Sequence, residues 1–146
     1  MIKRVVIGVD HGGLAIKERL ITRLESHEYE VKDMGVFSSD SVDYPDKVEE
    51  VYREYTSGNY EFAVVCCGTG IGVTISANKL PGVRCALPQN SFAAGLAKKH
   101  NNANFIAFGG RIEYSEPPED MLDAFINEEF EGDRHQRRVN KIMKLE

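Results

Sequence analysis

The stretch that decides the fold is residues 64–73, which read Val64-Val65-Cys66-Cys67-Gly68-Thr69-Gly70-Ile71-Gly72-Val73. The apolar run that begins at Phe62 is typical of a strand covered on both faces in a parallel sheet. Three glycines then alternate with other residues, and a helix-compatible segment runs from 73 to 79. Glycine permits positive φ and close approach of backbone N–H groups to a ligand. Because the next helix begins with free N–H groups at the positive end of its dipole, the loop is predicted to hold an anion.

A thiol stands at the edge of this predicted anion site. Cys67 is the last strand residue before the glycines. Free cysteine is usually a small buried hydrophobe, and taken alone that is the simpler interpretation. A thiol beside a helix N-terminus loses its proton more readily, however, and can then act as a base near neutral pH. The combination of a base with an array of donors predicts chemistry in which negative charge develops on oxygen.

Whole-chain properties exclude several classes of protein. With 146 residues, the chain is predicted to form one domain, and its net charge of −5 argues against non-specific nucleic-acid binding. No apolar run is long enough for a bilayer, and the N-terminus lacks the pattern of a signal peptide. Three cysteines cannot all pair within one chain and show no metal-type spacing. We therefore expect a cytoplasmic protein with reduced thiols, no membrane association and no metal.

Strand-like and helix-like segments alternate along the chain. This alternation, with short turns, is typical of an α/β fold with a parallel sheet and right-handed crossovers. Strands are predicted at 2–9, 29–34, 62–67, 83–87 and 105–108, and helices at 14–27, 45–57, 73–79, 92–100, 118–126 and 134–145.

Ligands in such sheets bind beyond the carboxyl ends of the strands. The residues just after three predicted strands are Asp10-His11, Cys67 to Gly72, and Gly109-Gly110-Arg111. All three groups are expected to open on the same edge. A nucleotide site fits this edge poorly, because the glycine loop has no lysine for a P-loop and follows the third strand rather than the first.

Several polar residues have a structural interpretation beside the functional one. Asp10 can simply cap the next helix, and His100, at the end of a predicted helix, can simply interact with the helix dipole. His11 is better placed for a site because it follows a strand. Arg134 and Arg138 are four residues apart and share a helix face, either as a solvated basic surface or as a clamp for a phosphate.

Seven motifs together resemble one enzyme family over essentially the whole chain. The motifs are Asp10-His11-Gly12, Asp43-Tyr44-Pro45, Cys67-Gly68-Thr69-Gly70-Ile71-Gly72, Ala77-Asn78-Lys79, His100-Asn101, Phe108-Gly109-Gly110-Arg111 and Gly132-Asp133-Arg134-His135-Gln136-Arg137-Arg138-Val139. With these motifs the chain resembles the type B ribose-5-phosphate isomerases, whose family also includes isomerases of allose 6-phosphate and galactose 6-phosphate.

The resemblance implies a fold, an assembly and a reaction. The fold is a Rossmann-like three-layer sandwich in which helices flank a five-stranded parallel sheet. The assembly is a homodimer or a dimer of dimers, in which the helix from about residue 134 reaches a partner subunit. The reaction is the interconversion of D-ribose 5-phosphate and D-ribulose 5-phosphate in the pentose phosphate pathway, through an enediolate and without a cofactor.

The resemblance also implies a role for each site residue. Cys67 is the base, Thr69 assists it, and His100 helps to open the furanose ring. Backbone N–H groups of Gly68, Gly70, Ile71, Gly72 and Val73 stabilise the enediolate. Asp10 and Tyr44 have supporting polar roles, Asn101 contacts sugar hydroxyls, and the phosphate is bound by His11, Arg111, Arg134 and Arg138, the last two from the partner subunit.

Two other functions remain open on this sequence. One is an isomerase chiefly of hexose 6-phosphates, such as allose 6-phosphate, and the other is a non-catalytic module that binds a sugar phosphate or a nucleotide. Cys67, Thr69 and His100 argue against the second. The turn Pro88-Gln89-Asn90 departs from the more acidic or serine-containing turn expected there, which leaves the preference between pentose and hexose open.

Overall fold

Five parallel strands form one sheet at the centre of the computed structural model, which describes residues 1–146. The strand order is β2-β1-β3-β5-β4, so β3 is central, and all six of its residues are buried. The strands are β1 (Arg4–Val9), β2 (Glu30–Asp33), β3 (Phe62–Cys67), β4 (Cys85–Ala86) and β5 (Phe105–Gly109).

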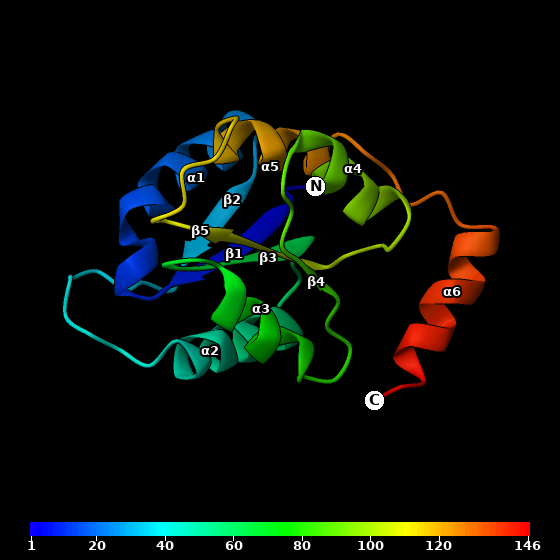
Figure 1. Ribbon diagram of the computed structural model, residues 1–146, viewed down its shortest axis with the longest axis horizontal. Coiled ribbons are helices and arrows are strands. Elements are labelled where there is room, and N and C mark those ends of the chain that lie inside the picture. Colours follow the sequence, from blue (N-terminus) through cyan, green and yellow to red (C-terminus); the bar gives the residue numbers. More distant parts are fainter.

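Helices cover both faces of the sheet, so the α/β three-layer prediction is confirmed (Figure 1). One face carries α1 (Leu14–Ser26), α4 (Ser91–Lys99) and α5 (Pro118–Ile126). The other carries α2 (Tyr44–Ser57) and α3 (Ile71–Asn78). None of the helices combines the length and the apolar character that a membrane span requires.

Alternate strand residues feed two separate cores. In β3, Val64 and Cys66 pack beneath α1 and α5, whereas Val65 and Cys67 pack beneath α2 and α3. This follows from the period of two along a strand, which points neighbouring side chains to opposite faces. The two adjacent cysteines therefore belong to different halves of the molecule.

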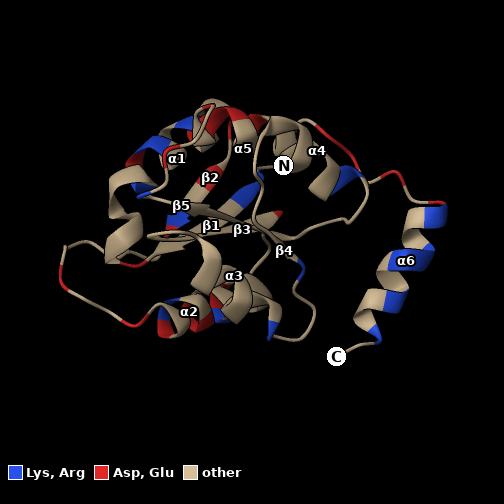
Figure 2. Cartoon of the chain, in the orientation of Figure 1, with Lys and Arg blue, Asp and Glu red and all other residues tan.

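The last helix, α6 (Arg134–Met143), stands apart from these layers (Figure 1). At its first turn His135 stacks on His100, and at its last turn Met143 Sδ lies 3.4 Å from a guanidinium nitrogen of Arg84. Basic residues are spread along the helix (Figure 2).

Several predicted boundaries differ from the structure by one or two residues, and two of them have a clear local cause. β4 covers only Cys85–Ala86 rather than 83–87, because the backbone N–H groups of the two preceding residues are bonded elsewhere: Val83 to the carbonyl of Leu80, and Arg84 to Asn104 Oδ1. α3 begins at Ile71, two residues earlier than predicted, because Gly70 with φ of 80° turns the chain directly into the helix.

Candidate active site

The carboxyl ends of β1, β3 and β5 carry three loops that touch one another. The N–H of Gly110 donates to the carbonyl of Cys67 at 2.8 Å, and the N–H of Arg111 donates to the carbonyl of Gly68 at 2.9 Å. A Cβ added to Gly110 would lie 2.3 Å from the carbonyl oxygen of Gly12, and one added to Gly12 would lie 2.7 Å from the nitrogen of Gly68. Only residues without a Cβ permit this packing, and the convergence predicted from the sequence is confirmed.

Cys67 closes β3 on the face covered by α2 and α3, where its side chain is 5% exposed. The N–H of Gly70 donates to its Sγ at 3.2 Å. Gly70 has a left-handed backbone, and a Cβ there would lie 2.7 Å from a methyl carbon of Leu87. The sulfur is therefore packed against apolar side chains on one side, while on the other the glycine loop folds back and directs a main-chain donor at it.

Further main-chain donors open the next helix. The Thr69 hydroxyl, which is exposed, accepts the N–H of Ile71 at 3.2 Å. The N–H groups of Gly72 and Val73 lie in the first turn of α3, where no intrahelical acceptor exists. The ring of Tyr44 lies against Gly72, since a Cβ there would be 2.5 Å from two of its ring atoms. This arrangement can hold a negatively charged oxygen beside an aromatic wall.

The carboxylate of Asp10 accepts hydrogen bonds from the backbone of its own loop. It is 5% exposed, and its Oδ1 accepts the N–H groups of Gly12 at 2.7 Å and Gly13 at 3.2 Å. These bonds cap the short 3₁₀ turn His11–Gly13. Asp10 thus holds the first loop in shape, as its capping interpretation predicts.

Two cationic or polar donors flank the loop. His11 Nδ1 accepts the N–H of Val42 at 3.4 Å, which leaves Nε2 as the ring nitrogen that carries the proton. The side chain of Arg111, which is exposed, extends over Gly68: a Cβ there would lie 3.4 Å from its Nη1. Both groups can reach an anion that sits above the loop.

The remaining predicted residues lie at the opposite edge of the sheet. α4 returns from the carboxyl edge to the amino edge, and His100 and Asn101 follow its last turn. Nearby, the carbonyl of Asn104 accepts the N–H of Ala63 at the start of β3. Because six strand residues span roughly 17–20 Å, His100 and Cys67 do not meet within one chain.

Arg134 and Arg138 belong to this second group. Both are exposed on α6, and their helix is joined to the end of α4 by the stack of His135 on His100. The structure therefore divides the predicted site into two half-sites. Asp10, His11, Tyr44, Cys67 to Val73 and Arg111 form the first, and His100, Asn101, Arg134 and Arg138 form the second.

A histidine pair in the second half-site escaped the sequence analysis. The rings of His100 and His135 are stacked, with centroids 4.1 Å apart and planes 11° apart. Glu131 joins them, so that one donor atom from each residue lies within 4.8 Å of the others. A cation bound by both imidazoles must lie in the plane of each ring, and two nearly parallel planes do not allow this. The geometry suits a stacked pair better than a metal centre.

Two lysines that the sequence analysis did not single out fix the loop between β2 and α2. Lys17 is 2% exposed, and its Nζ donates to the carbonyl of Val36 at 2.8 Å and lies 3.0 Å from Asp33 Oδ2. Lys47 Nζ donates to the carbonyl of Met34 at 2.9 Å. The burial of Lys17 could have been predicted from the sequence, because this residue follows Ile16 on the apolar face of a predicted helix.

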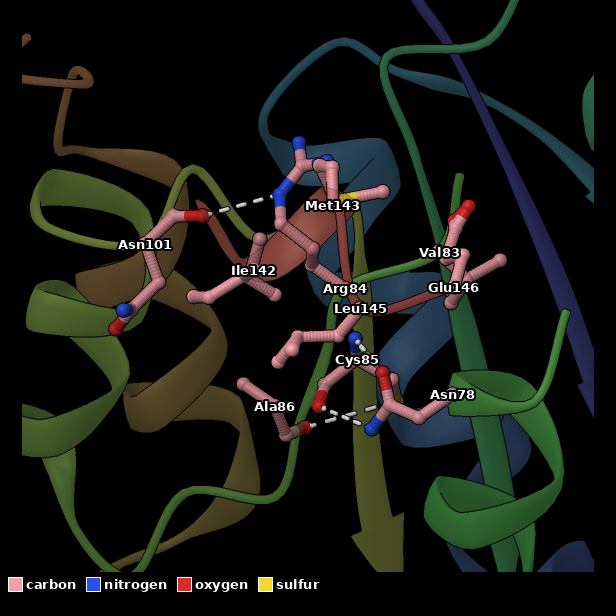
Figure 3. A pocket seen from close by; sticks show the side chains of 11 residues that line it. Asn78, Val83, Arg84, Cys85, Ala86, Asn101, Ile142, Met143, Leu145 and Glu146 are labelled. Atoms are coloured by element: carbon pink, nitrogen blue, oxygen red, sulfur yellow. Dashed lines mark hydrogen bonds between the residues drawn. The ribbon is translucent and has the colours of Figure 1, made fainter. Parts of the chain in front are cut away.

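A cavity of about 440 Å³ lies between the end of α6 and the body of the molecule (Figure 3). Asn101 is the only predicted site residue that lines it. Its other walls are Asn78, Val83, Arg84, Cys85, Ala86, Ala103, Ile142, Met143, Leu145 and Glu146. The cavity is distinct from the loops around Cys67.

Comparisons with known proteins agree over the full chain. The sequence profile of the ribose/galactose isomerase family matches residues 5–142. Ribose-5-phosphate isomerase B of Escherichia coli (strain K12) is 35% identical over 144 residues, which cover 99% of this chain and 97% of the relative. The structure of ribose-5-phosphate isomerase B from Clostridium thermocellum has a TM-score of 0.92 and 40% identity over 97% of this chain and 96% of that one. A ribose 5-phosphate isomerase from Thermotoga maritima has a TM-score of 0.91 and 37% identity over 97% and 98%.

Proposed function

The chain belongs to the ribose/galactose isomerase family, and on that premise we propose that it interconverts D-ribose 5-phosphate and D-ribulose 5-phosphate, a step of the pentose phosphate pathway. Full-length relatives named ribose-5-phosphate isomerase B support the substrate. The observation that carries the chemistry is the strand-end sulfur of Cys67, which faces the N–H of Gly70 in a loop of main-chain donors.

In the proposed reaction, Cys67 moves one proton. Its thiolate removes the proton from C2 of the open-chain aldose, and the bonding electrons form the C1–C2 double bond while negative charge collects on O1. The thiol then returns the proton to C1, and the O2 proton passes to O1 with the help of Thr69. General base catalysis of this kind contributes about 10²–10⁴-fold.

The glycine loop stabilises the charge that develops on oxygen. Donors in the glycine loop and in the first turn of α3, from Gly68 to Val73, are fixed by the fold before the substrate arrives, so they need no reorganisation during the reaction. The loss of one such donor typically costs about 3–4 kcal/mol. Several such donors acting together make the loop the larger contributor to the rate, and Tyr44 and Asp10 hold its surroundings in place.

Each complete site requires two subunits in this proposal. His11 and Arg111 of one chain bind the phosphate together with Arg134 and Arg138 of the partner subunit. His100 and Asn101 lie with those arginines, so they also come from the partner, which extends the partner's share beyond the two arginines expected from the sequence.

A homodimer, or a dimer of dimers, supplies this partner. α6 stands off the single domain formed by the chain, with its basic residues exposed (Figure 2). Large apolar side chains are also exposed on α3 and α4, namely Ile71 at 53%, Ile75 at 58% and Phe92 at 75%. A second copy that covers these side chains brings the two half-sites together. The three free cysteines fit a cytoplasmic location.

An isomerase assay with two sugars tests the proposal. We expect kcat/KM for ribose 5-phosphate to exceed that for allose 6-phosphate. The reverse order would indicate a hexose 6-phosphate isomerase. Binding of aldose phosphates without turnover of any would indicate a non-catalytic module.

A further inference from the structure

His135 is buried in an unusual way for a polar residue. The residue is 4% exposed, and its Nε2 has no hydrogen-bond partner. The Oε1 of Glu131 lies 3.7 Å from this nitrogen, which is too long for a hydrogen bond. The contact that the ring does make is its stack on His100.

Main-chain bonds hold both rings in this stack. The N–H of His135 donates to the carbonyl of Gly132 at 2.9 Å, and the N–H of Glu131 donates to the carbonyl of Lys99 at 2.9 Å. The second bond ties the segment before α6 to the last residue of α4. The two histidines are therefore attached to elements that are themselves fixed against each other.

The surroundings of His135 favour its neutral form. Burial lowers the pKa of its imidazole, and the nearby His100, Arg134 and Arg138 lower it further, whereas Glu131 raises it. The position of His135 in the first turn of α6 also favours the neutral ring, because a helix N-terminus disfavours positive charge. A neutral ring can stack on His100 whether or not His100 carries a second proton.

We propose that His135 is a positioning residue, whose stacked ring holds the imidazole of His100 in the orientation that opens the sugar ring. The inference rests on the proposed function. In the opening step His100 gives a proton to the ring oxygen O4 as the C1–O4 bond breaks. The C1 hydroxyl becomes the aldehyde, its proton passes to water, and His100 regains a proton from water.

The two directions of the reaction separate this role from a merely structural one. Ribulose 5-phosphate carries its phosphate on O5 and forms no furanose, so its isomerisation needs no ring opening. The open-chain aldose that it yields can leave and close in water. A fault in the orientation of His100 therefore slows turnover of ribose 5-phosphate more than turnover of ribulose 5-phosphate.

The experiment compares His135→Ala with His135→Phe in both directions. For His135→Ala we expect kcat with ribose 5-phosphate to fall on the order of tenfold, within the range that misplacement of a catalytic group produces. The kcat with ribulose 5-phosphate should stay within about threefold of the wild type, and KM should change little because Arg134 and Arg138 keep their places. His135→Phe, which keeps an aromatic ring, should restore most of the lost rate.

Two results would overturn the inference. One is an equal loss in both directions with a raised KM, which would show that the substitution displaces α6 and its arginines. The other is unchanged kinetics in His135→Ala. The ring-proton NMR signals of His100 report the stack directly: they should move in His135→Ala and stay shielded in His135→Phe. Because wild-type activity is measured alongside, failure of the proposed function is recognised separately.

Discussion

Cys66 and Cys67 are neighbours in β3 with opposite surroundings. Cys66 is fully buried among the side chains beneath α1 and α5, and this burial raises the pKa of its thiol far above the ordinary value. Cys67 lies on the other face and receives the N–H of Gly70. Because successive side chains of a strand point to opposite faces of the sheet, the two neighbouring thiols differ in their surroundings and therefore in their chemistry.

Cys67→Ala should abolish most of the isomerase activity while binding persists. We expect kcat to fall by about 10²–10⁴-fold, the usual contribution of a general base. The affinity for ribitol 5-phosphate, which cannot isomerise, should stay within about threefold of the wild type by calorimetry, because the phosphate contacts remain. Cys66→Ala is the matched control and should keep its kcat. Full turnover by Cys67→Ala would remove the thiol from the mechanism.

Thiols with a raised pKa also predict a loss of stability in alkali. Burial raises the pKa of Cys66, and that of Cys85 to about 12. Above the unfolded value of about 8.5, the unfolded chain releases these protons while the folded chain retains them. The free energy of unfolding should therefore fall as pH rises, by about 1.4 kcal/mol per pH unit for each thiol. Partly buried tyrosines with raised pKa add to the loss at higher pH: Tyr29, Tyr55, Tyr60 and Tyr114.

Urea unfolding at pH 8, 9 and 10 measures this slope. Cys66→Ala should show a shallower decline between pH 9 and 10 than the wild type, because one of the titrating thiols is gone. Parallel declines in the two proteins would show that Cys66 titrates alike in the folded and unfolded chains.

At the scale of elements, the loop between β2 and α2 depends on a buried cation. Lys17 reaches from α1 to the carbonyl of Val36 and to Asp33. The same loop brings the N–H of Val42 to His11 and leads to Tyr44 at the start of α2. A lysine on the apolar face of one helix thus shapes the wall of a site formed by other elements.

Lys17→Met should destabilise the protein by about 3 kcal/mol, because it leaves Asp33 and a main-chain carbonyl without their buried partner. Urea unfolding at pH 7 gives the value. Lys32→Met, on the exposed side of β2, is the matched control and should change stability by less than about 0.5 kcal/mol. Equal effects of the two substitutions would show that the buried ion pair contributes nothing specific.

At the scale of the whole molecule, the predicted site is split between two edges of the sheet. Cys67 lies at the carboxyl edge, whereas His100 lies beyond the end of α4 near the amino edge. α6 extends from this second edge, away from the layers (Figure 1). Each monomer therefore carries two different half-sites. In a symmetric dimer, each half-site of one subunit meets the complementary half-site of the other, which gives two complete sites.

Mixing two variants, each inactive toward ribose 5-phosphate, tests this arrangement with that sugar as the substrate. In a heterodimer of Cys67→Ala with His100→Ala, one site carries both substitutions and the other carries neither. Subunits mixed in equal amounts and refolded together should therefore regain about a quarter of the wild-type activity, as random pairing of symmetric dimers requires. Each variant refolded alone should stay inactive toward ribose 5-phosphate. A mixture without recovered activity would place both residues in a site built from one chain.

Much of the fold was predictable because its signals are local. The apolar run 62–67 and the glycines after it gave β3 its observed bounds, and proline and glycine residues marked both ends of α2. The 83–87 strand was predicted too long, because the partners that take up the N–H groups of Val83 and Arg84 lie in turns and in a distant side chain. No local pattern reveals such partners.

By itself, the sequence determined the parallel α/β architecture and the meeting of the three loops around Cys67, because strand periodicity and short crossovers leave few other arrangements. The tertiary structure alone decided that His135 stacks on His100 and that Lys17 finds a carbonyl and a carboxylate inside the fold. These contacts join residues far apart in the chain, and their existence depends on the angles and distances at which whole elements pack.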